Sequence, residues 1–440
     1  MKLKLFLVLF IAGSVLYGQT RKIEFTQYDM DNGIHVILHQ DNSTPIVAIT
    51  MTFHVGSKNE DPTRTGFAHF FEHLMFEGSK YMERGDYDKL SQNAGGTNNA
   101  STSFDKTFYY QVLPSNQLEL GLWMESERLA HLKIDSIGVE TQRKVVKEER
   151  SQRYDNQPYG SIFEQTFKRA YKVHPYRWMP IGSAQYIDQA TLGEFMAFYN
   201  KFYVPQNVTI SIAGDIDLAK AKELVAKYYG DIPRGIEDIK KVDVVEPPLG
   251  GEVRDVVYDN IQLPLVLEAY RIPAQGTKDY YAIEMLSSLL SKGQSSRLYK
   301  EIVDKQQKAV FLSSMNYAME DPGLFVVYGI TNMGVTPEDL EAVIETELTK
   351  VKEKTIDEQE FQKLRNQIES DFVNSNSTMI GIANSLADYY VYFGDANLIN
   401  TEIDRYMKVT KEDIRDAAKK YLSPENRVVL YYLPKSAEKK

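Results

Sequence analysis

Residues 44–47 read Thr-Pro-Ile-Val and residues 263–266 read Leu-Pro-Leu-Val, each a proline that leads into an apolar run. A second matching pair, Pro205-Gln206-Asn207 and Pro424-Glu425-Asn426, stands where a helical pattern passes into a strand pattern. Both pairs are offset by 219 residues (264 − 45 and 424 − 205). Because chance matches would not share one spacing at two distant points, we expect that one domain has been duplicated.

Each expected half mixes strand and helix patterns. Residues 46–55 and 208–213 are apolar and rich in β-branched side chains, which predicts strands. Residues 118–131 and 411–421 have the spacing of amphipathic helices. We therefore predict an α+β fold with two homologous domains, each an antiparallel sheet with helices packed on one face.

A linker is predicted at residues 233–251. This stretch contains Pro247-Pro248 and Gly250-Gly251, which do not continue a helix. It divides the chain into a first domain at residues 19–232 and a second at residues 252–440.

Composition narrows the function classes. The chain has 440 residues, of which 43% are apolar, so it can bury two sizeable cores. The net charge of −10 and the lack of basic runs argue against nucleic acid and anionic membrane surfaces as partners. The chain has no cysteine, which excludes disulfides, a thiol nucleophile and a thiolate zinc site.

The N-terminus has the layout of a secretory signal peptide at residues 1–18. Lys2 and Lys4 precede an apolar run over residues 5–15, and small residues follow. No other stretch of about 20 apolar residues occurs, so no stable membrane insertion is expected after cleavage. The prediction is a periplasmic or secreted bacterial protein, with an uncleaved anchor as the alternative.

Residues 69–73 read His-Phe-Phe-Glu-His, the H-x-x-E-H order of an inverted zinc-peptidase motif. On a helix His69 and His73 lie one turn apart on one face, and Glu72 projects beside them. Two imidazoles can share a zinc ion, and a neighbouring carboxylate can act as general base. The alternatives are a solvated helix face or buried core histidines.

A third ligand must come from another segment. All seven histidines precede residue 175, so only the first half can hold a histidine site. The helical, charge-rich residues 139–154 offer Glu140, Glu148 and Glu149 as candidates.

Four segments together resemble the pitrilysin/insulinase metallopeptidases, a family that includes the mitochondrial processing peptidase. They are HFFEHLMFEGS (69–79), GGTNNASTSFDKTFYY (95–110), RKVVKEERSQRYDNQPYG (143–160) and YNKFYVPQNVTISIAGD (199–215). The resemblance covers nearly the whole mature chain.

The resemblance implies one zinc ion per chain, held by His69, His73 and Glu149. In the family a glutamate about 76 residues after the second histidine is the third ligand, and here that position is Glu149. Glu72 is implied as general base. Gln142 stands seven residues before Glu149, where family members often have a glutamate that supports the ligands.

Substrate contacts are also implied by the resemblance. Residues 95–110 begin with Gly95-Gly96 and continue in a β-prone pattern that could form a sheet edge, where an extended peptide adds as a further strand. The family places Asn99 and Ala100 on that edge and Phe76 in the pocket before the scissile bond. Phe76 as a core residue and Asn99 as a turn residue are the alternatives.

The second half has no equivalent metal motif. Adding 219 to positions 69, 72 and 73 gives Ser288, Ser291 and Lys292. Family enzymes commonly supply an arginine and a tyrosine from the inactive half, and here the two positions are Val303 and Val310. We therefore expect a homologous subunit that supplies this Arg/Tyr pair, in a heterodimer of the type found among bacterial and mitochondrial members. The alternatives are a homodimer or an alignment shifted by a few residues.

The predicted function is that of a zinc metalloendopeptidase, the catalytic subunit of such a heterodimer. A noncatalytic scaffold and a peptide-binding subunit that does not cleave are the rival hypotheses.

Overall fold

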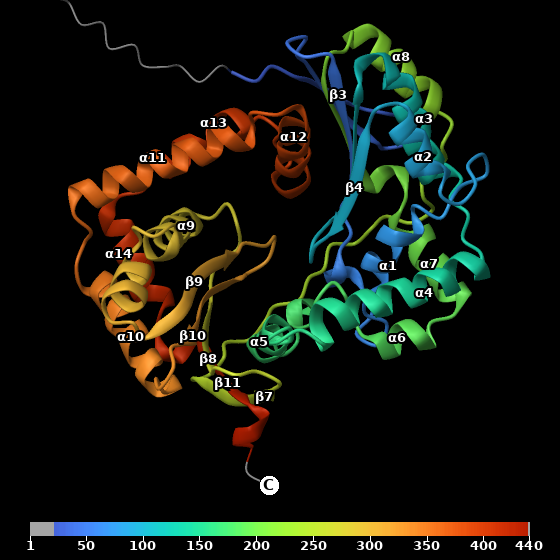
Figure 1. Ribbon diagram of the computed structural model, residues 1–440. Coiled ribbons are helices and arrows are strands. Elements are labelled where there is room, and N and C mark those ends of the chain that lie inside the picture. Colours follow the sequence, from blue (N-terminus) through green and yellow to red (C-terminus); the bar gives the residue numbers. More distant parts are fainter. Residues whose placement is uncertain (1–21, 439–440) are drawn as a thin grey trace, which may run out of the picture.

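The computed structural model describes residues 22–438, which form two α+β halves (Figure 1). The predicted signal peptide lies outside the described residues. The strands and α-helices of the first half are β1 (Thr26–Asp29), β2 (His35–Gln40), β3 (Ile46–Phe53), α1 (Phe67–Leu74), α2 (Asp86–Asn93), β4 (Thr97–Thr102), β5 (Thr107–Pro114), α3 (Leu118–Ala130), α4 (Ser136–Arg150), α5 (Ile162–Ala170), α6 (Ala184–Gln189), α7 (Leu192–Phe202), β6 (Val208–Gly214) and α8 (Leu218–Tyr229). Those of the second half are β7 (Val253–Asp259), β8 (Leu265–Arg271), α9 (Lys278–Ser291), β9 (Ala309–Tyr317), β10 (Leu324–Thr331), α10 (Pro337–Glu353), α11 (Glu358–Ser375), α12 (Met379–Phe393), α13 (Leu398–Met407), α14 (Lys411–Tyr421) and β11 (Arg427–Pro434).

The two sheets have the same strand order. The first runs β1-β2-β6-β3-β5-β4 and the second β7-β11-β8-β10-β9. The five strands of the second sheet correspond, in this order, to β2, β6, β3, β5 and β4 of the first. One pair in each sheet, β2 with β6 and β7 with β11, is parallel, and the remaining pairs are antiparallel. The α+β fold and the duplication are confirmed, with sheets that are mixed rather than wholly antiparallel.

The two matching Pro-x-Asn segments form the same local structure in both halves. Each forms a single 3₁₀ turn between a helix and a central strand, at Pro205–Asn207 and Pro424–Asn426. The Asn207 amide donates to the carbonyl of Phe202 at 2.8 Å, and the Asn426 amide donates to the carbonyl of Tyr421 at 2.9 Å. Both contacts satisfy a carbonyl at a helix end that would otherwise have no partner.

One helix of each half packs on the sheet of the other half. In α5, Ile162 and Phe167 are buried in a core with side chains of β8, β10 and β11, so a helix of the first half covers the second sheet. In α12, Ile382 and Leu386 are buried against side chains of β2, β3 and β6 of the first sheet. Figure 1 shows α5 beside β8 and β11, and α12 beside β3.

The exchange explains how both faces of each sheet are buried. The predicted helices on one face are present, because α3 packs on β3 and β5 and α10 packs on β8 and β10. The opposite face is covered by the helix from the other half. The two exchanged helices, α5 and α12, occupy equivalent places in the duplicated chain.

The segment between the sheets is fixed in place. Residues 230–252, which include the stretch predicted as a linker, contain no helix or strand. Glu246 nevertheless accepts hydrogen bonds from the backbone N–H groups of Lys172, Val173 and His174 and pairs with Arg271 at 2.8 Å. Among the described residues no helix is long and apolar enough to cross a membrane.

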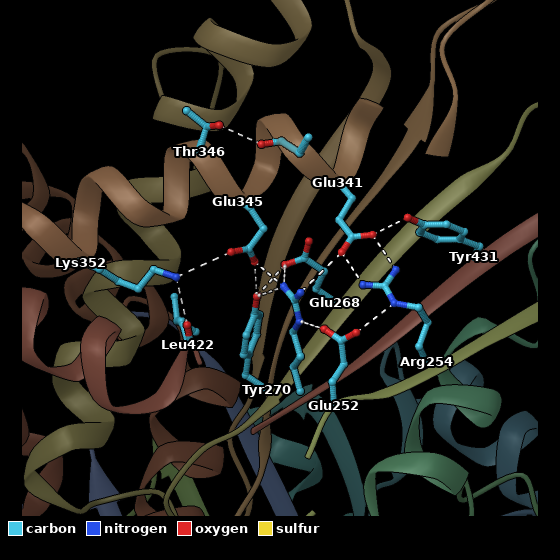
Figure 2. Close-up of polar contacts among 12 residues, drawn as sticks. Glu252, Arg254, Glu268, Tyr270, Glu341, Glu345, Thr346, Lys352, Leu422 and Tyr431 are labelled. Atoms are coloured by element: carbon cyan, nitrogen blue, oxygen red, sulfur yellow. Dashed lines mark hydrogen bonds and ion pairs between the residues drawn. The ribbon is translucent and has the colours of Figure 1, made fainter. Parts of the chain in front are cut away.

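A polar cluster lies between the second sheet and α10 (Figure 2). Glu268 on β8 has no exposed surface, and the hydroxyl of Tyr270 donates to its carboxylate at 2.6 Å. Arg427 lies 3.7 Å from Glu268 and also binds Glu345. Burial raises the pKa of Glu268 to about 8, and the charge of Glu345 acts in the same direction.

This cluster predicts a pH-dependent stability. The pKa of Glu268 is about 8 in the folded chain, and that of an unperturbed glutamate is about 4.3. The folded state therefore keeps a proton that the unfolded chain has lost, and the free energy of unfolding falls as pH rises between these values. In Glu268→Gln this loss should disappear, so the stability of the variant relative to the original chain should increase from pH 5 to pH 8. Urea unfolding at several pH values measures the difference.

Glu353→Gln removes an exposed carboxylate from α10, the helix that covers the cluster, and is the matched control. A difference between Glu268→Gln and the original chain that stays constant with pH would contradict the prediction.

Candidate metal centre and active-site cavity

The helix that carries the H-x-x-E-H motif begins at a buried carboxylate. Gly66 precedes α1 with a φ of 98°, and a Cβ there would lie 3.0 Å from the carbonyl oxygen of Ile181. The carboxylate of Glu60 accepts the N–H groups of Gly66 and Ala68, both at 2.9 Å. These N–H groups have no partner within the helix, so Glu60 caps it from a distance. Burial raises the pKa of Glu60 to about 8.

Aromatic packing sets the rotation of α1. Phe70 and Phe71 are fully buried, and the ring of Phe70 stacks on Phe195 with centroids 4.4 Å apart. The hydroxyl of Tyr109 donates to the carbonyl of Phe71 at 3.2 Å. With the phenylalanine face held in the core, the opposite face of the helix turns its polar side chains toward the space between the two halves.

His69, His73 and Glu149 come together, with one ligand atom of each within 4.8 Å of the others. Oε2 of Glu149 lies 3.5 Å from Nε2 of His69 and 3.2 Å from Nε2 of His73. Ligands about 2.0–2.2 Å from a tetrahedral zinc ion lie about 3.3–3.6 Å from one another. The donor set and these two separations therefore fit one zinc ion.

Two features of α4 position Glu149. The helix starts at Asp135, whose side chain accepts the N–H of Gly138 at 2.8 Å, and after Arg150 it continues as a π-helical turn over Ser151–Asp155. In that turn Arg153 binds Oε1 of Glu149 at 2.7 Å. Oε2 is left to face the histidines.

The charges suit metal binding. Burial, followed by the charge of His73, lowers the pKa of His69 to about 4, so its imidazole is neutral at neutral pH. A hydrogen bond with His73 lowers the pKa of Glu149. Neutral imidazole and ionised carboxylate are the protonation states that a metal ligand requires.

Glu72 lies on the same face of α1 and is positioned from the sheet. The hydroxyl of Thr102, the last residue of β4, donates to Oε2 of Glu72 at 2.5 Å. Burial raises the pKa of Glu72, and the Thr102 hydrogen bond opposes that effect. A carboxylate held next to a metal site by one donor can exchange protons with a substrate or with water.

A cavity of about 1340 Å³ opens at this centre, between the two halves. The first half contributes His69, Glu72, His73 and Glu149 together with residues of β4. The second half contributes the end of β9 with Tyr317, and also Gln275, Asp388 and Tyr392. The volume exceeds the range of about 300–1000 Å³ that is usual for small-molecule sites.

Two of the three expected substrate contacts line the cavity. Asn99 and Ala100 lie on β4, the outermost strand of the first sheet, which pairs only with β5 among the described residues. Phe76 is not among the lining residues. Its half-buried ring packs on Tyr87 and on the guanidinium of Arg128, which places it in the adjoining core.

Gln142 and the two valines also lie away from the centre. The Gln142 amide donates to Glu77 at 2.5 Å, and no contact with the three ligands is found. Val303 packs against the core of the second half, and Val310 at the start of β9 is 51% exposed. Neither valine lines the cavity.

A buried ion cluster joins the halves next to the cavity. Lys58 is 3% exposed, and its ammonium lies 2.8 Å from Asp105 and 2.5 Å from Glu320 of the β9–β10 loop. His54 also contacts Glu320 at 2.8 Å. Although burial acts in the opposite direction, His54 and Lys58 hold the pKa of Glu320 well below its usual range. The loop that Lys58 anchors follows Tyr317 directly, so the cluster fixes the wall of the cavity formed by the second half.

Sequence reasoning missed Thr102, Arg153, Glu60 and Lys58. The i,i+4 spacing of Glu149 and Arg153 is a signal that could have identified Arg153 as a partner of the ligand. Thr102 lies within the quoted stretch at 95–110, but its contact with Glu72 depends on the approach of β4 to α1. Glu60 and Lys58 gave no local signal, because each acts on residues that only the tertiary fold brings close.

Comparison with protein families identifies both halves. Residues 35–178 match the model described as insulinase (peptidase family M16), and residues 189–368 match the peptidase M16 inactive domain. The first match contains the three candidate ligands and Glu72. The second contains Ser288 and Lys292, the equivalents of the two histidines.

Similar proteins extend over almost the whole chain. The zinc protease PqqE of Helicobacter pylori is 30% identical over 96% of both chains, and a zinc protease of Rickettsia felis without a described role is 24% identical over 91% of this chain and 96% of its own. A crystal structure of a protease from Helicobacter pylori superimposes with a TM-score of 0.90 at 29% identity, covering 94% of this chain and 100% of that one. A structure from Pseudomonas fluorescens, titled as a peptidase M16 inactive domain, shares the fold with a TM-score of 0.84 at 18% identity, covering 95% of this chain and 99% of that one.

The ion cluster around Lys58 predicts that replacing either of two lysines that bind Glu320 has very different effects on the stability of the chain. Lys58→Met leaves Asp105 buried without an ammonium and leaves Glu320 only its contacts with His54 and the exposed Lys241, which should lower the free energy of unfolding by about 3–5 kcal/mol. Urea unfolding followed by the fluorescence of Trp178 measures it, because the indole N–H donates to Ser57, next to Lys58, at 2.9 Å.

Lys241→Met is the control. Lys241 contacts Glu320 at 2.9 Å, but its side chain is 69% exposed, so its removal should change stability by less than about 1 kcal/mol. Equal losses in the two variants would show that the buried pairs do not hold the halves together.

Proposed function

The chain belongs to the insulinase family, peptidase family M16, and on that premise we propose that it is a zinc-dependent endopeptidase. One observation carries the proposal most directly. His69, His73 and Glu149 bring three ligand atoms within 4.8 Å of one another, and the Glu149 oxygen lies 3.5 and 3.2 Å from the two imidazole nitrogens, as at a tetrahedral zinc site. Glu72 stands beside them in a large cavity. We propose one zinc ion per chain, because the described residues contain a single group of this kind.

Nε2 of His69, Nε2 of His73 and Oε2 of Glu149 would hold the ion. Zinc in such a site supplies Lewis acidity, which polarises a carbonyl and makes water a stronger acid. Arg153 keeps the second oxygen of Glu149 occupied and so fixes the direction of the first. The polar partners of the ligands orient them as much as the helix does.

Glu72 is proposed as general base and then general acid. It would take a proton from the attacking water and pass it to the leaving amine of the scissile peptide bond. Burial raises the pKa of its carboxyl, which favours acceptance of that proton, and Thr102 keeps the carboxylate pointing into the cavity.

Peptides are proposed to bind as an additional strand on β4. Along β4, Thr97, Asn99 and Ser101 are exposed, while Ala100 and Thr102 are half-buried. The free edge of β4 ends at Thr102, which contacts Glu72, so a peptide paired with this edge would pass the metal site. Backbone pairing tolerates many substrate sequences, and the preference then depends on side-chain pockets.

The assembly is proposed to include a homologous second subunit. Positions 303 and 310 are valines that do not line the cavity of this chain. Because valine cannot donate a side-chain hydrogen bond, an Arg/Tyr pair of the family type would have to come from another chain. We also propose export to the periplasm or the exterior, on the basis of the signal-like residues 1–18, which lie outside the described residues.

Substitution of Glu72 should separate chemistry from metal binding. Glu72→Gln keeps all three ligands but removes the base, so it should retain zinc and lose about 100- to 10,000-fold in turnover. His69→Ala removes a ligand and should lose both zinc and turnover. Zinc content by mass spectrometry and cleavage of a quenched fluorescent peptide library are measured on the same preparations. Undiminished turnover in Glu72→Gln would remove Glu72 from the mechanism.

The second subunit has its own test. The purified mature chain should bind zinc but cleave poorly, and addition of a homologous chain with the Arg/Tyr pair should restore cleavage. Full, chelator-sensitive activity of this chain alone would overturn the need for a partner. Zinc and peptide binding without cleavage in every assembly would instead favour the peptide-binding subunit, and the lack of both would favour a scaffold.

A further inference from the structure

A second cavity occupies the place in the second half that the metal site occupies in the first. Ser288, Lys292 and Ile368 are the residues 219 positions after His69, His73 and Glu149, and all three line a cavity of about 530 Å³. The cavity lies among α9, α11, α12 and α13, which gather on one side of the molecule in Figure 1. Loss of the ligands in the duplicated half has therefore left the hollow in place.

The second cavity adjoins the first. Gln275, Asp388 and Tyr392 line both cavities. These three shared residues are therefore the boundary that a side chain of a peptide at the zinc site would have to pass to reach the second cavity.

The charges of the second cavity are unbalanced. Lys292 is its only cationic lining residue, and it is paired with Asp371, while Asp388 is paired with Lys106. Glu284 and Glu402 remain, and neither forms an ion pair within the described part of the chain. Glu402 is 8% exposed and accepts from the hydroxyl of Tyr281 at 3.2 Å, and Glu284 accepts from the amide of Asn316 at 2.7 Å.

The electrostatic cost of this arrangement is visible at Glu284. Burial raises the pKa of Glu284 to about 7, and the neighbouring charge of Glu402 acts in the same direction. The charge of Lys292 lowers the pKa of Glu284, but less than burial raises it. The charge of Arg405 acts on Glu402. Two neighbouring carboxylates in a confined cavity are unfavourable, and a further cation would relieve their repulsion.

The walls suit an organic cation rather than a metal ion. Tyr280, Tyr389 and Tyr406 line the cavity together with Phe372 and Phe393. Aromatic rings attract ammonium and guanidinium groups through their faces and pack on the apolar stems of lysine and arginine. The described residues hold one metal-like group, at His69, and Glu284 and Glu402 are not part of another.

We propose that this cavity is a specificity pocket that binds a lysine or arginine side chain of the peptide substrate, with Glu284 and Glu402 as the countercharges. The proposal rests on the proposed peptidase function, because the ligand is part of a peptide held at the zinc site. It assigns the inactive half a share in substrate selection.

The test uses the active assembly and peptides that share one scissile sequence. A single arginine is moved along the peptide, and each arginine peptide is matched by one with citrulline, which is neutral and of nearly the same shape. At one position the ratio of kcat/KM for arginine over citrulline should reach about 10 or more, since a buried charge-assisted pair is lost in the citrulline peptide. The ratio should fall to about 1 in Glu284→Gln/Glu402→Gln.

Two further variants keep the test decisive. Glu369→Gln changes an exposed carboxylate of α11, next to Ile368 but outside the cavity, and should keep the arginine preference. Ser288→Arg leaves both carboxylates and supplies a tethered guanidinium, so it should abolish the preference even if the double variant fails to fold. An arginine preference that persists in Ser288→Arg, or its absence at every position in the original chain, would overturn the proposal.

Binding without cleavage distinguishes this proposal from that of the peptidase. Labelled arginine and citrulline peptides are titrated into Glu72→Gln, and fluorescence anisotropy gives the two dissociation constants. Suppose that the original assembly cleaves no peptide, but the arginine peptide binds about 10-fold more tightly than the citrulline peptide and this difference depends on Glu284 and Glu402. The pocket is then supported and the peptidase function is not. Equal binding of both peptides, together with cleavage by the original assembly, would overturn the pocket and support the peptidase function.

Discussion

The exchange of helices α5 and α12 is the constraint on which the rest of the molecule depends. Each sheet buries one face under its own helices and the other under a helix of the opposite half, with Phe167 and Leu386 fully buried at the two contacts. A buried side chain of this size stabilises the fold by about 1.5–3 kcal/mol, so separation of the halves would expose a row of such residues on both sheets. The two sheets must therefore face each other at a fixed distance, and the active-site cavity is the space that this arrangement leaves.

The metal centre inherits its geometry from that frame. The segment Lys58–Glu60 precedes α1, and its two ends act on different partners: Lys58 binds the β9–β10 loop of the second half, while Glu60 caps the helix that carries His69 and His73. The same short stretch thus places the cavity wall and the zinc helix relative to each other. Precise ligand positions on α1 and a chamber closed by the second half are consequences of one set of buried carboxylate contacts.

Much of the architecture could be predicted from the sequence, because duplication leaves a constant offset between matching segments. Much of the site could also be predicted, because the spacing of ligands on a helix is a local property. His69, Glu72 and His73 share one turn, whereas Glu149 required the family spacing to choose it over Glu148. Contacts between distant segments left no such signal. The family pattern implies Phe76 as a pocket residue, and nothing in the sequence indicates that its ring packs on Arg128 and Tyr87. The helix exchange was also invisible, since α5 and α12 have the amphipathic pattern of any helix that covers a sheet, and no pattern says which sheet.

The duplicated sites show how one backbone can hold two kinds of chemistry. At the three equivalent positions the first half has His69, His73 and Glu149, and the second has Ser288, Lys292 and Ile368. Lys292 cannot bind zinc as an ammonium and is paired with Asp371. The three equivalent positions of the second cavity therefore supply no metal ligand. Its remaining carboxylates, the half-buried Glu284 and the buried Glu402, come from positions that are not equivalent to any ligand. Had the second half simply lost its site, apolar side chains of similar volume would have been the more stable filling, because carboxylates that are partly removed from water cost free energy. That they line a cavity next to the catalytic one is the reason to assign them a partner from the substrate.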